Sequence, residues 1–247
     1  MTFKAFVVDL DGVIYVGDRL LPGAREKIQK LRRQGRVIFL TNNSTKSRKA
    51  YVDKLLGLGI DVSEYDIFTS GYVSALYIKE KLGIAKVFVV GEEGLKKELE
   101  MMGHEICFRD CNVVITGLDR DFNYSKMAMA SRFIREGAEF IATSPDATFI
   151  TERGFMPGGG AIVKAIEVAS GKNAIVVGKP SKIIGKLIMK ELGVKPDEIL
   201  LIGDRLETDI AFGKAMRMKT ALVLTGVTTE DEVRNSKIKP DFVLDRL

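Results

Sequence analysis

Short apolar runs alternate with amphipathic stretches along the whole chain, and this alternation restricts the fold more than any other feature. Runs rich in Val and Ile predict buried strands at residues 3–10, 36–43, 86–93, 112–119, 139–146, 174–180, 198–205 and 220–226. Their apolar residues lie on both faces, as in parallel strands covered by helices on both sides. The stretches between them, such as residues 23–35 and 47–59, have helical spacing and end near glycine. The pattern predicts an α/β fold of parallel sheets with right-handed crossovers.

The composition is that of a globular protein with a substantial core. Of the 247 residues, 46% are hydrophobic and 29% are charged, and no apolar run is long enough to span a membrane. The N-terminal segment leads straight into a strand and lacks the features of a signal peptide, so we expect a cytoplasmic protein. The net charge is +5, but basic and acidic residues are interspersed. We therefore expect a mild attraction for anionic substrates, and neither nucleic-acid nor membrane binding.

One histidine and two cysteines limit the available chemistry. His104 lies close in sequence to Cys107 and Cys111. A zinc site or a disulfide framework requires more ligands or a secreted context, so we interpret these three as packing or surface residues. A single histidine without a G-x-S-x-G motif also argues against a serine hydrolase.

Paired acids follow the first predicted strand. Asp9 and Asp11 are separated by one residue, and Gly12 then allows the backbone to approach a ligand closely. Carboxylates this close repel each other unless a cation or a proton lies between them, and oxygen ligands of this kind suit Mg²⁺. The alternative is a pair of surface acids in a turn.

Residues suited to phosphate follow two other strands. Thr41 offers a hydroxyl, and the amides after it open towards a helix, which favours an anion. The alternative is helix capping by Asn43 or Ser44. Lys179 provides a point charge that can neutralise phosphate, and its alternative is a solvated surface lysine.

A further strand is followed by Gly203, Asp204 and, five positions after Asp204, Asp209. Asp204 would add a carboxylate for a metal, and Asp209 would orient the ligands from behind. The alternative for Asp209 is a charge in the first turn of the next helix. Because parallel strands end at one crevice, these acids, the hydroxyl and the lysine together predict a phosphoryl-transfer site.

In its motifs DLDGV, TNN, GKP and GDRLETD, the chain resembles the haloacid dehalogenase (HAD) superfamily of phosphatases. In LLPGA, TNNS, SPDATF, GGGAIVKAIE and GKPS it is similar to the class IIA branch, the NagD-like or p-nitrophenyl phosphatase group. The resemblance extends over nearly the whole chain. It implies a doubly wound parallel-sheet core with an inserted α/β cap domain. It also implies an Mg²⁺-dependent phosphomonoester hydrolase that acts on small phosphorylated metabolites through an aspartyl-phosphate intermediate.

The resemblance also implies a role for each motif residue. Asp9 would be the nucleophile and a Mg²⁺ ligand. Asp11 would act as general acid and then as general base, and its backbone carbonyl would bind the metal. Asp204 would be a metal ligand, with Asp209 supporting it. The residues that hold the transferring phosphoryl group would be Thr41, Asn42 and Lys179.

The long gap between Thr41 and Lys179 predicts an inserted domain, because a single crossover needs only a few dozen residues. We expect the core to comprise residues 1–72 and 178–247 and the cap to comprise residues 73–177. A cap over the crevice excludes water and contributes substrate contacts.

The candidate cap contacts are Ser144 and Asp146. Members of the class IIA branch commonly have Asn where this chain has Ser144, which affects substrate preference rather than the core chemistry. The glycine run at residues 157–160 is better explained as the flexible start of the following helix than as a direct contact.

Two other functions are compatible with the same motif residues. A phosphomutase would use the same core chemistry, and a non-catalytic module that binds a phosphate ligand would keep the fold without turnover. Sugar phosphates, nucleotides, phosphoglycolate and pyridoxal phosphate are all plausible substrates for this branch. A homodimer formed through the cap is also compatible with the resemblance.

Overall fold

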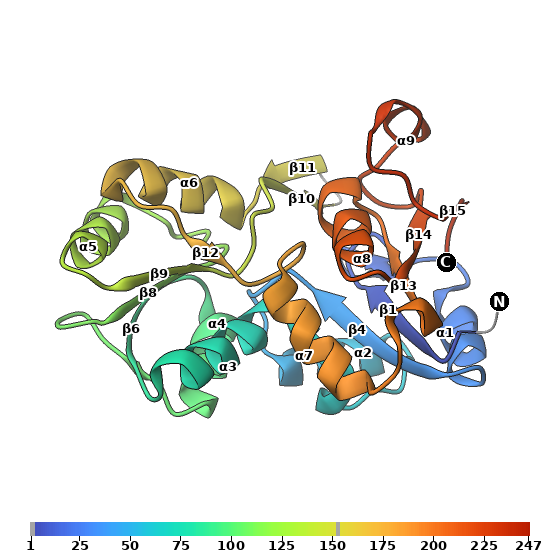
Figure 1. Cartoon of the computed structure of the whole chain (residues 1–247), viewed down its shortest axis with the longest axis horizontal. Helices are drawn as coiled ribbons and strands as arrows, with labels where there is room; N and C mark the ends of the chain where they lie inside the picture. The colour runs from blue at the N-terminus through green and yellow to red at the C-terminus, as the bar shows by residue number, and fades with distance from the viewer. Residues whose placement is uncertain (1–2, 152–153) are drawn as a thin grey trace.

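The computed structural model describes residues 3–151 and 154–247. The chain forms two parallel sheets that lie side by side along the long axis of the molecule, with helices on the faces of each (Figure 1). Both chain ends lie at the far side of the first sheet. We call this first sheet, with its helices, the core, and the second the cap.

The core sheet is six-stranded and entirely parallel, in the order β15-β14-β13-β1-β4-β5. Its strands are β1 (Ala5–Asp9), β4 (Arg36–Thr41), β5 (Ile67–Thr69), β13 (Ile199–Gly203), β14 (Lys219–Val223) and β15 (Phe242–Leu244). The chain runs outward from β1 on one side and then returns to build the other side from β13. The strand order therefore reverses next to β1, where ligands bind in doubly wound sheets.

Side chains alternate between the two faces of the core sheet. In β1, Phe6 and Val8 pack among helices α1 (Ala24–Arg32) and α2 (Arg48–Gly57). Ala5 and Val7 belong to the apolar cluster of the opposite face, which includes residues of α7 (Lys182–Leu192) and α8 (Ala211–Ala215). Both faces are covered, which explains why the strands are apolar throughout.

The cap sheet is five-stranded and parallel, in the order β12-β9-β8-β6-β7. Its strands are β6 (Lys86–Val90), β7 (Glu105–Ile106), β8 (Val113–Thr116), β9 (Glu139–Ala142) and β12 (Ile175–Val176). Helices α5 (Tyr124–Arg135) and α6 (Gly159–Ser170) cover one face. Helices α3 (Ser70–Leu82) and α4 (Glu93–Met101) cover the other.

One apolar cluster continues from the core into the cap. It joins Val7 and Leu40 of the core sheet to Ile115 of the cap sheet through residues of α3 and α4, such as Ile78 and Leu95. The two sheets are thus connected by packed side chains on this side of the molecule, in addition to the chain crossings (Figure 1).

Short elements complete the described chain. Two antiparallel hairpins are formed, one by β2 (Tyr15–Val16) with β3 (Arg19–Leu20) and one by β10 (Thr148–Thr151) with β11 (Gly154–Pro157). The remaining helical segments are η1 (Glu64–Asp66), η2 (Pro196–Glu198), the π-helical turn η3 (Leu206–Ile210) and α9 (Glu230–Asn235).

The prediction of a doubly wound parallel core with an inserted α/β cap is confirmed. Each predicted apolar run contains a strand, and the two helices predicted from residues 23–35 and 47–59 correspond to α1 and α2. The sequence did not predict β5 and β15, which have three residues each and are too short to establish a periodicity. Among the described residues, no helix combines the length and the apolar character needed to cross a membrane.

The two cysteines are buried packing residues, as expected, but they are also joined to each other, which was not expected. Cys107 and Cys111 form a disulfide in the segment between β7 and β8, with their Cα atoms 6.1 Å apart. This separation lies in the range that a disulfide spans, and only the folded turn brings the two residues into it. His104 is a packing residue as expected, because it is buried and its ring nitrogens contact the Ala85 amide and the Ala75 carbonyl.

Candidate active site

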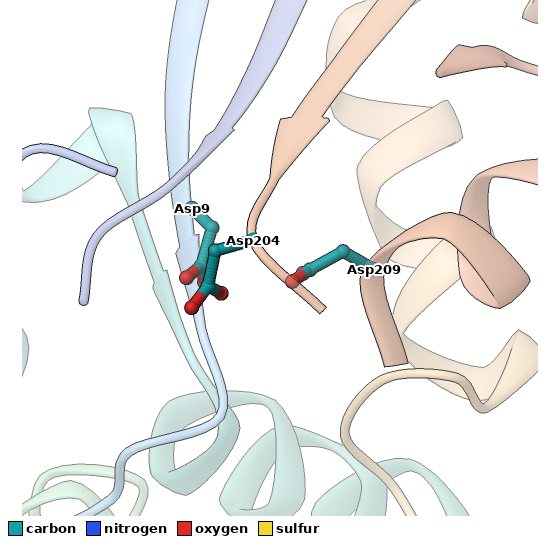
Figure 2. Close-up of side chains that lie close together, drawn as sticks. All are labelled: Asp9, Asp204 and Asp209. Carbon is teal, nitrogen blue, oxygen red and sulfur yellow. The ribbon is translucent and has the colours of Figure 1, made fainter. Parts of the chain in front are cut away.

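The acidic residues predicted from separate strand ends lie together at the reversal point of the core sheet. Asp9 is the last residue of β1, Asp204 directly follows β13, and Asp209 belongs to η3. Carboxylate oxygens of all three lie within 4.8 Å of one another. Figure 2 shows Asp9 and Asp204 next to each other, with the carboxylate of Asp209 pointing towards them. All three are buried, which excludes the surface alternative for Asp9. Asp209 does lie in the first turn of η3, as its alternative predicted, but its carboxylate also belongs to the cluster.

Lys179 lies at the centre of this cluster. Its Nζ is 2.5 Å from Asp9 Oδ1, 2.5 Å from Asp209 Oδ1 and 3.4 Å from the Leu40 carbonyl oxygen. The side chain is 2% exposed, so the alternative of a solvated surface lysine is wrong. Burial lowers the pKa of Lys179, but the carboxylates of Asp209 and Asp9 raise it by more, so the net shift is upward. The ammonium group is therefore charged and holds the two acids in place.

The oxygens that remain free fit a divalent cation. Both oxygens of Asp209 are engaged, one by Lys179 and the other by the Arg205 amide, which donates at 3.1 Å. Asp204 Oδ2 accepts from the Val227 amide at 2.8 Å. Within the described part of the chain, Asp9 Oδ2 and Asp204 Oδ1 have no hydrogen-bond partner. Two free carboxylate oxygens in buried surroundings are a suitable donor set, with Asp209 supporting from behind.

The pKa shifts agree with a cation site. Burial raises the pKa of Asp204 to about 7, and the neighbouring Asp209 carboxylate adds to the rise. Burial also raises the pKa of Asp9 well above its usual range, although Lys179 opposes the shift. The cluster has more negative charge than Lys179 neutralises, so a proton or a cation stabilises it.

Asp11 lines the same cavity but is not part of the three-acid cluster. Burial raises the pKa of Asp11, and Lys54 opposes this rise more than any other charge. The Lys54 Nζ lies 3.6 Å from the centre of the Tyr15 ring and donates to the Gly17 carbonyl. A carboxyl with a raised pKa carries a proton more readily, which suits a group that protonates a leaving alcohol.

The segment after β4 forms a polar loop beside Lys179. Thr41 is buried, and its Oγ1 accepts from the Asn43 amide at 3.1 Å. Asn42 links core and cap: its Oδ1 accepts from the Lys179 amide at 2.8 Å, and its Nδ2 donates to Asp146 at 3.0 Å. Contrary to the alternative for this segment, neither Asn43 nor Ser44 caps the following helix, because the N-cap of α2 is Ser47.

The cap contributes Ser144 and Asp146 to the wall of the cavity. Ser144 Oγ accepts from the Asp146 amide at 3.0 Å and so stabilises the turn after β9. Asp146 Oδ1 is a buried atom with no hydrogen-bond partner among residues 3–151 and 154–247. The glycine run does lead into α6, but a side chain on Gly160 would overlap the Pro145 carbonyl, so close packing rather than flexibility explains it.

Some lining residues were not predicted from the sequence. Arg205 donates to the Thr148 carbonyl at 2.9 Å and thereby ties the core to the hairpin β10–β11, and Phe149 lines the cavity. The GDR motif included Arg205, but nothing in the sequence indicated its contact with the cap. The cavity encloses about 80 Å³ between core and cap.

Gly226 encloses the Asp204 carboxylate from the far side. A Cβ on Gly226 would overlap Asp204 Oδ2, and one on Gly12 would meet the same atom at 2.5 Å. The absence of a side chain at these two positions makes room for the Asp204 carboxylate in its observed orientation.

We therefore expect Gly226→Ala to rotate the Asp204 carboxylate and to weaken divalent-cation binding by about 10- to 100-fold, because supporting groups commonly contribute that much. Isothermal titration with Mg²⁺ measures the change. Gly57→Ala is the matched control, since a Cβ there meets no atom within 4 Å. Equal Mg²⁺ affinity in Gly226→Ala and the wild type would show that Asp204 does not bind the cation.

Comparison with known families agrees with this geometry. Residues 6–105 match a family described as haloacid dehalogenase-like hydrolase, and residues 176–247 match a HAD-hydrolase-like family. The chain belongs to the haloacid dehalogenase superfamily. The two matched segments contain all of the site residues predicted in the core and leave most of the cap between them. In Arabidopsis thaliana, a chloroplastic phosphoglycolate phosphatase is 39% identical over 99% of this chain and 75% of its own length.

Solved HAD structures place the chain more closely. The 4-nitrophenylphosphatase of Thermotoga maritima is 34% identical, with a TM-score of 0.94 over 99% of this chain and 95% of that one. NagD of Escherichia coli K-12 is 32% identical, with a TM-score of 0.89 over 100% of this chain and 97% of that one. The chain is thus a NagD-like HAD phosphatase, a phosphoric monoester hydrolase.

Proposed function

We propose that this protein is an Mg²⁺-dependent phosphatase that hydrolyses small phosphorylated metabolites through an aspartyl-phosphate intermediate. One observation supports this more than any other: Lys179 lies between Asp9 and Asp209 while Asp9 Oδ2 stays free at the cavity. The arrangement holds a carboxylate nucleophile beside a fixed positive charge, as attack on an anionic phosphate requires.

In the first half of the reaction, Asp9 attacks phosphorus and the ester oxygen leaves with the proton of Asp11. In the second half, Asp11 removes a proton from water and the water oxygen attacks phosphorus. The bond between phosphorus and the Asp9 oxygen breaks, which releases inorganic phosphate and regenerates the Asp9 carboxylate. We assign the oxygens of the transferring group to Lys179, to the Thr41 hydroxyl and to the Asn42 amide.

The side chains of Asp9 and Asp204 and the backbone carbonyl of Asp11 would hold Mg²⁺, with Asp209 orienting the cluster. When bound, the ion neutralises the phosphate and the acidic cluster. We prefer Mg²⁺ because the donors are oxygens and the ion keeps bound water readily.

We propose residues 73–177 as the cap and residues 1–72 and 178–247 as the core. The cap would exclude water and contribute Ser144 and Asp146 to substrate binding. A cytoplasmic location, the absence of nucleic-acid and membrane partners, and a homodimer through the cap stay predictions from the sequence and its resemblance.

Release of inorganic phosphate from p-nitrophenyl phosphate tests the proposal. We expect turnover in Mg²⁺ and less than about 1% of that rate after chelation by EDTA, because the cation cancels repulsion between Asp9 and phosphate. Restoring Mg²⁺ is the control, and it should return the activity. A panel of sugar phosphates, nucleotides, phosphoglycolate and pyridoxal phosphate then identifies the substrate class.

Two outcomes would favour the alternatives. Conversion of a phosphate ester to its isomer without free phosphate would indicate a phosphomutase. Metal-dependent binding of phosphate esters without any turnover would indicate a non-catalytic binding module.

A further inference from the structure

The cap contacts the loop that follows Thr41 and begins with Asn42, two of the proposed phosphate ligands. This loop, residues 42–47, connects β4 to α2 in the core. The Gly94 amide of α4 donates to the Thr45 carbonyl at 3.1 Å. The hydroxyls of Ser44 and Thr143, one from each domain, lie 3.2 Å apart. Contacts from two separate cap segments therefore converge on one short core loop.

Glycines allow this close approach. A Cβ on Gly94 would overlap the backbone of Lys46, and one on Gly117 would lie 2.5 Å from Ser44 Oγ. Gly94 is in the first turn of α4, and Gly117 directly follows β8, so both are held by regular elements of the cap sheet and its helices. Because the backbone of α4 lies directly against the backbone of the loop at Lys46, the loop has little room to shift relative to the cap.

Glu98 of α4 makes a further contact between cap and core, at the start of α2. Its side chain is 1% exposed, and Oε1 accepts from the Arg48 amide at 2.6 Å while Oε2 lies 3.4 Å from Arg48 Nε. Arg48 is the first residue of α2, where amides lack a partner within the helix. The Arg48 guanidinium also lies 3.7 Å from the centre of the Tyr72 ring. A carboxylate of the cap thus completes the start of a core helix.

The stability of the fold alone does not explain well why the Glu98 carboxylate is buried. Burial raises the pKa of Glu98, although the Arg48 amide and side chain oppose the shift. A buried ion pair often stabilises no more than apolar side chains of the same volume, but it fixes the relative position of its partners. Position is what a phosphate-binding loop requires.

We propose that Glu98 is a positioning residue, which fixes the start of α2 from the cap and thereby places the Thr41 hydroxyl and the Asn42 amide against the phosphate. The proposal rests on the proposed phosphatase function in one respect only, namely that the ligand of the loop is a phosphate group. Motion of the cap on this side would carry the loop with it.

Substitutions of Glu98 test the proposal through catalysis and through phosphate binding. We expect Glu98→Ala to lower kcat/KM for p-nitrophenyl phosphate by about 10- to 100-fold and to raise the Kd of inorganic phosphate, measured calorimetrically in Mg²⁺. Glu98→Gln keeps an acceptor for the Arg48 amide and should recover most of both. Glu100→Ala, an exposed acid on the same helix, is the control and should match the wild type.

A merely structural role would lower the Tm of Glu98→Ala and leave kcat, KM and the phosphate Kd of the folded protein unchanged. That result overturns the proposal. If Glu98→Ala does not fold, Glu98→Asp withdraws the carboxylate by one methylene and should raise the phosphate Kd in the same direction; an unchanged Kd there also overturns it. Phosphate binding needs no turnover, so a failure of the phosphatase proposal is distinguished from a failure of this one.

Discussion

Asp9→Asn removes turnover: we expect kcat for p-nitrophenyl phosphate to fall by at least about 10⁴-fold, as for other nucleophiles that act within a catalytic unit. An amide does not attack phosphorus, and its neutral oxygen binds a cation more weakly. The side chain keeps its shape, and its Oδ1 still accepts from Lys179, so the fold should persist.

The measurement compares phosphate release by the two proteins at saturating Mg²⁺, with far-UV circular dichroism to verify folding. A single turnover with ³²P-labelled substrate, quenched in acid, should label the wild type and not Asp9→Asn. Asp61→Asn makes the same chemical change at an exposed position and should be fully active. Covalent labelling of Asp9→Asn, or activity within tenfold of the wild type, would assign the nucleophile to another residue.

Lys179→Met should give the largest loss of stability. Lys179 is the only cation in contact with Asp9 and Asp209 among the described residues, and both carboxylates are buried. Removing one partner of a buried ion pair leaves uncompensated charge and costs about 3–5 kcal/mol. The pKa of Asp9 should rise further, because the ammonium that lowers it is lost. Catalysis should also fail, since the phosphoryl group loses its counter-charge.

Urea unfolding in the presence of EDTA measures this free energy. Lys182→Met, an exposed lysine at the start of α7, is the matched control and should change stability by less than about 0.5 kcal/mol. Mg²⁺ should restore part of the stability of Lys179→Met, since the ion compensates the same carboxylates. A variant as stable as the wild type in EDTA would mean that Lys179 does not neutralise the cluster.

Much of the site was predictable because chain order and fold class together place strand ends. Asp9, Thr41, Lys179 and Asp204 are far apart in sequence, yet each follows an apolar run. In a parallel sheet, such positions meet at one edge whatever the length of the intervening chain. This is why local motifs were enough to predict that these residues line one cavity.

Side-chain pairing was not predictable in the same way. The sequence did not indicate that Lys179 binds Asp209 as well as Asp9, or that both oxygens of Asp209 are engaged. Such contacts depend on rotamers and on separations of a few ångströms, which strand-end rules do not specify. The Cys107–Cys111 disulfide was missed for the same reason.

The sequence by itself determined the parallel α/β architecture, the position of the inserted domain and the acids and lysine at the strand ends. Periodicity and chain order are local properties, and they are sufficient for these features. Only the tertiary structure decided how the cap meets the core. The contact between Glu98 and Arg48 joins helices fifty positions apart through a buried carboxylate and a partly buried arginine. Neither residue belongs to a motif, so only the packing of one domain on the other reveals that α4 of the cap contacts the start of α2 in the core.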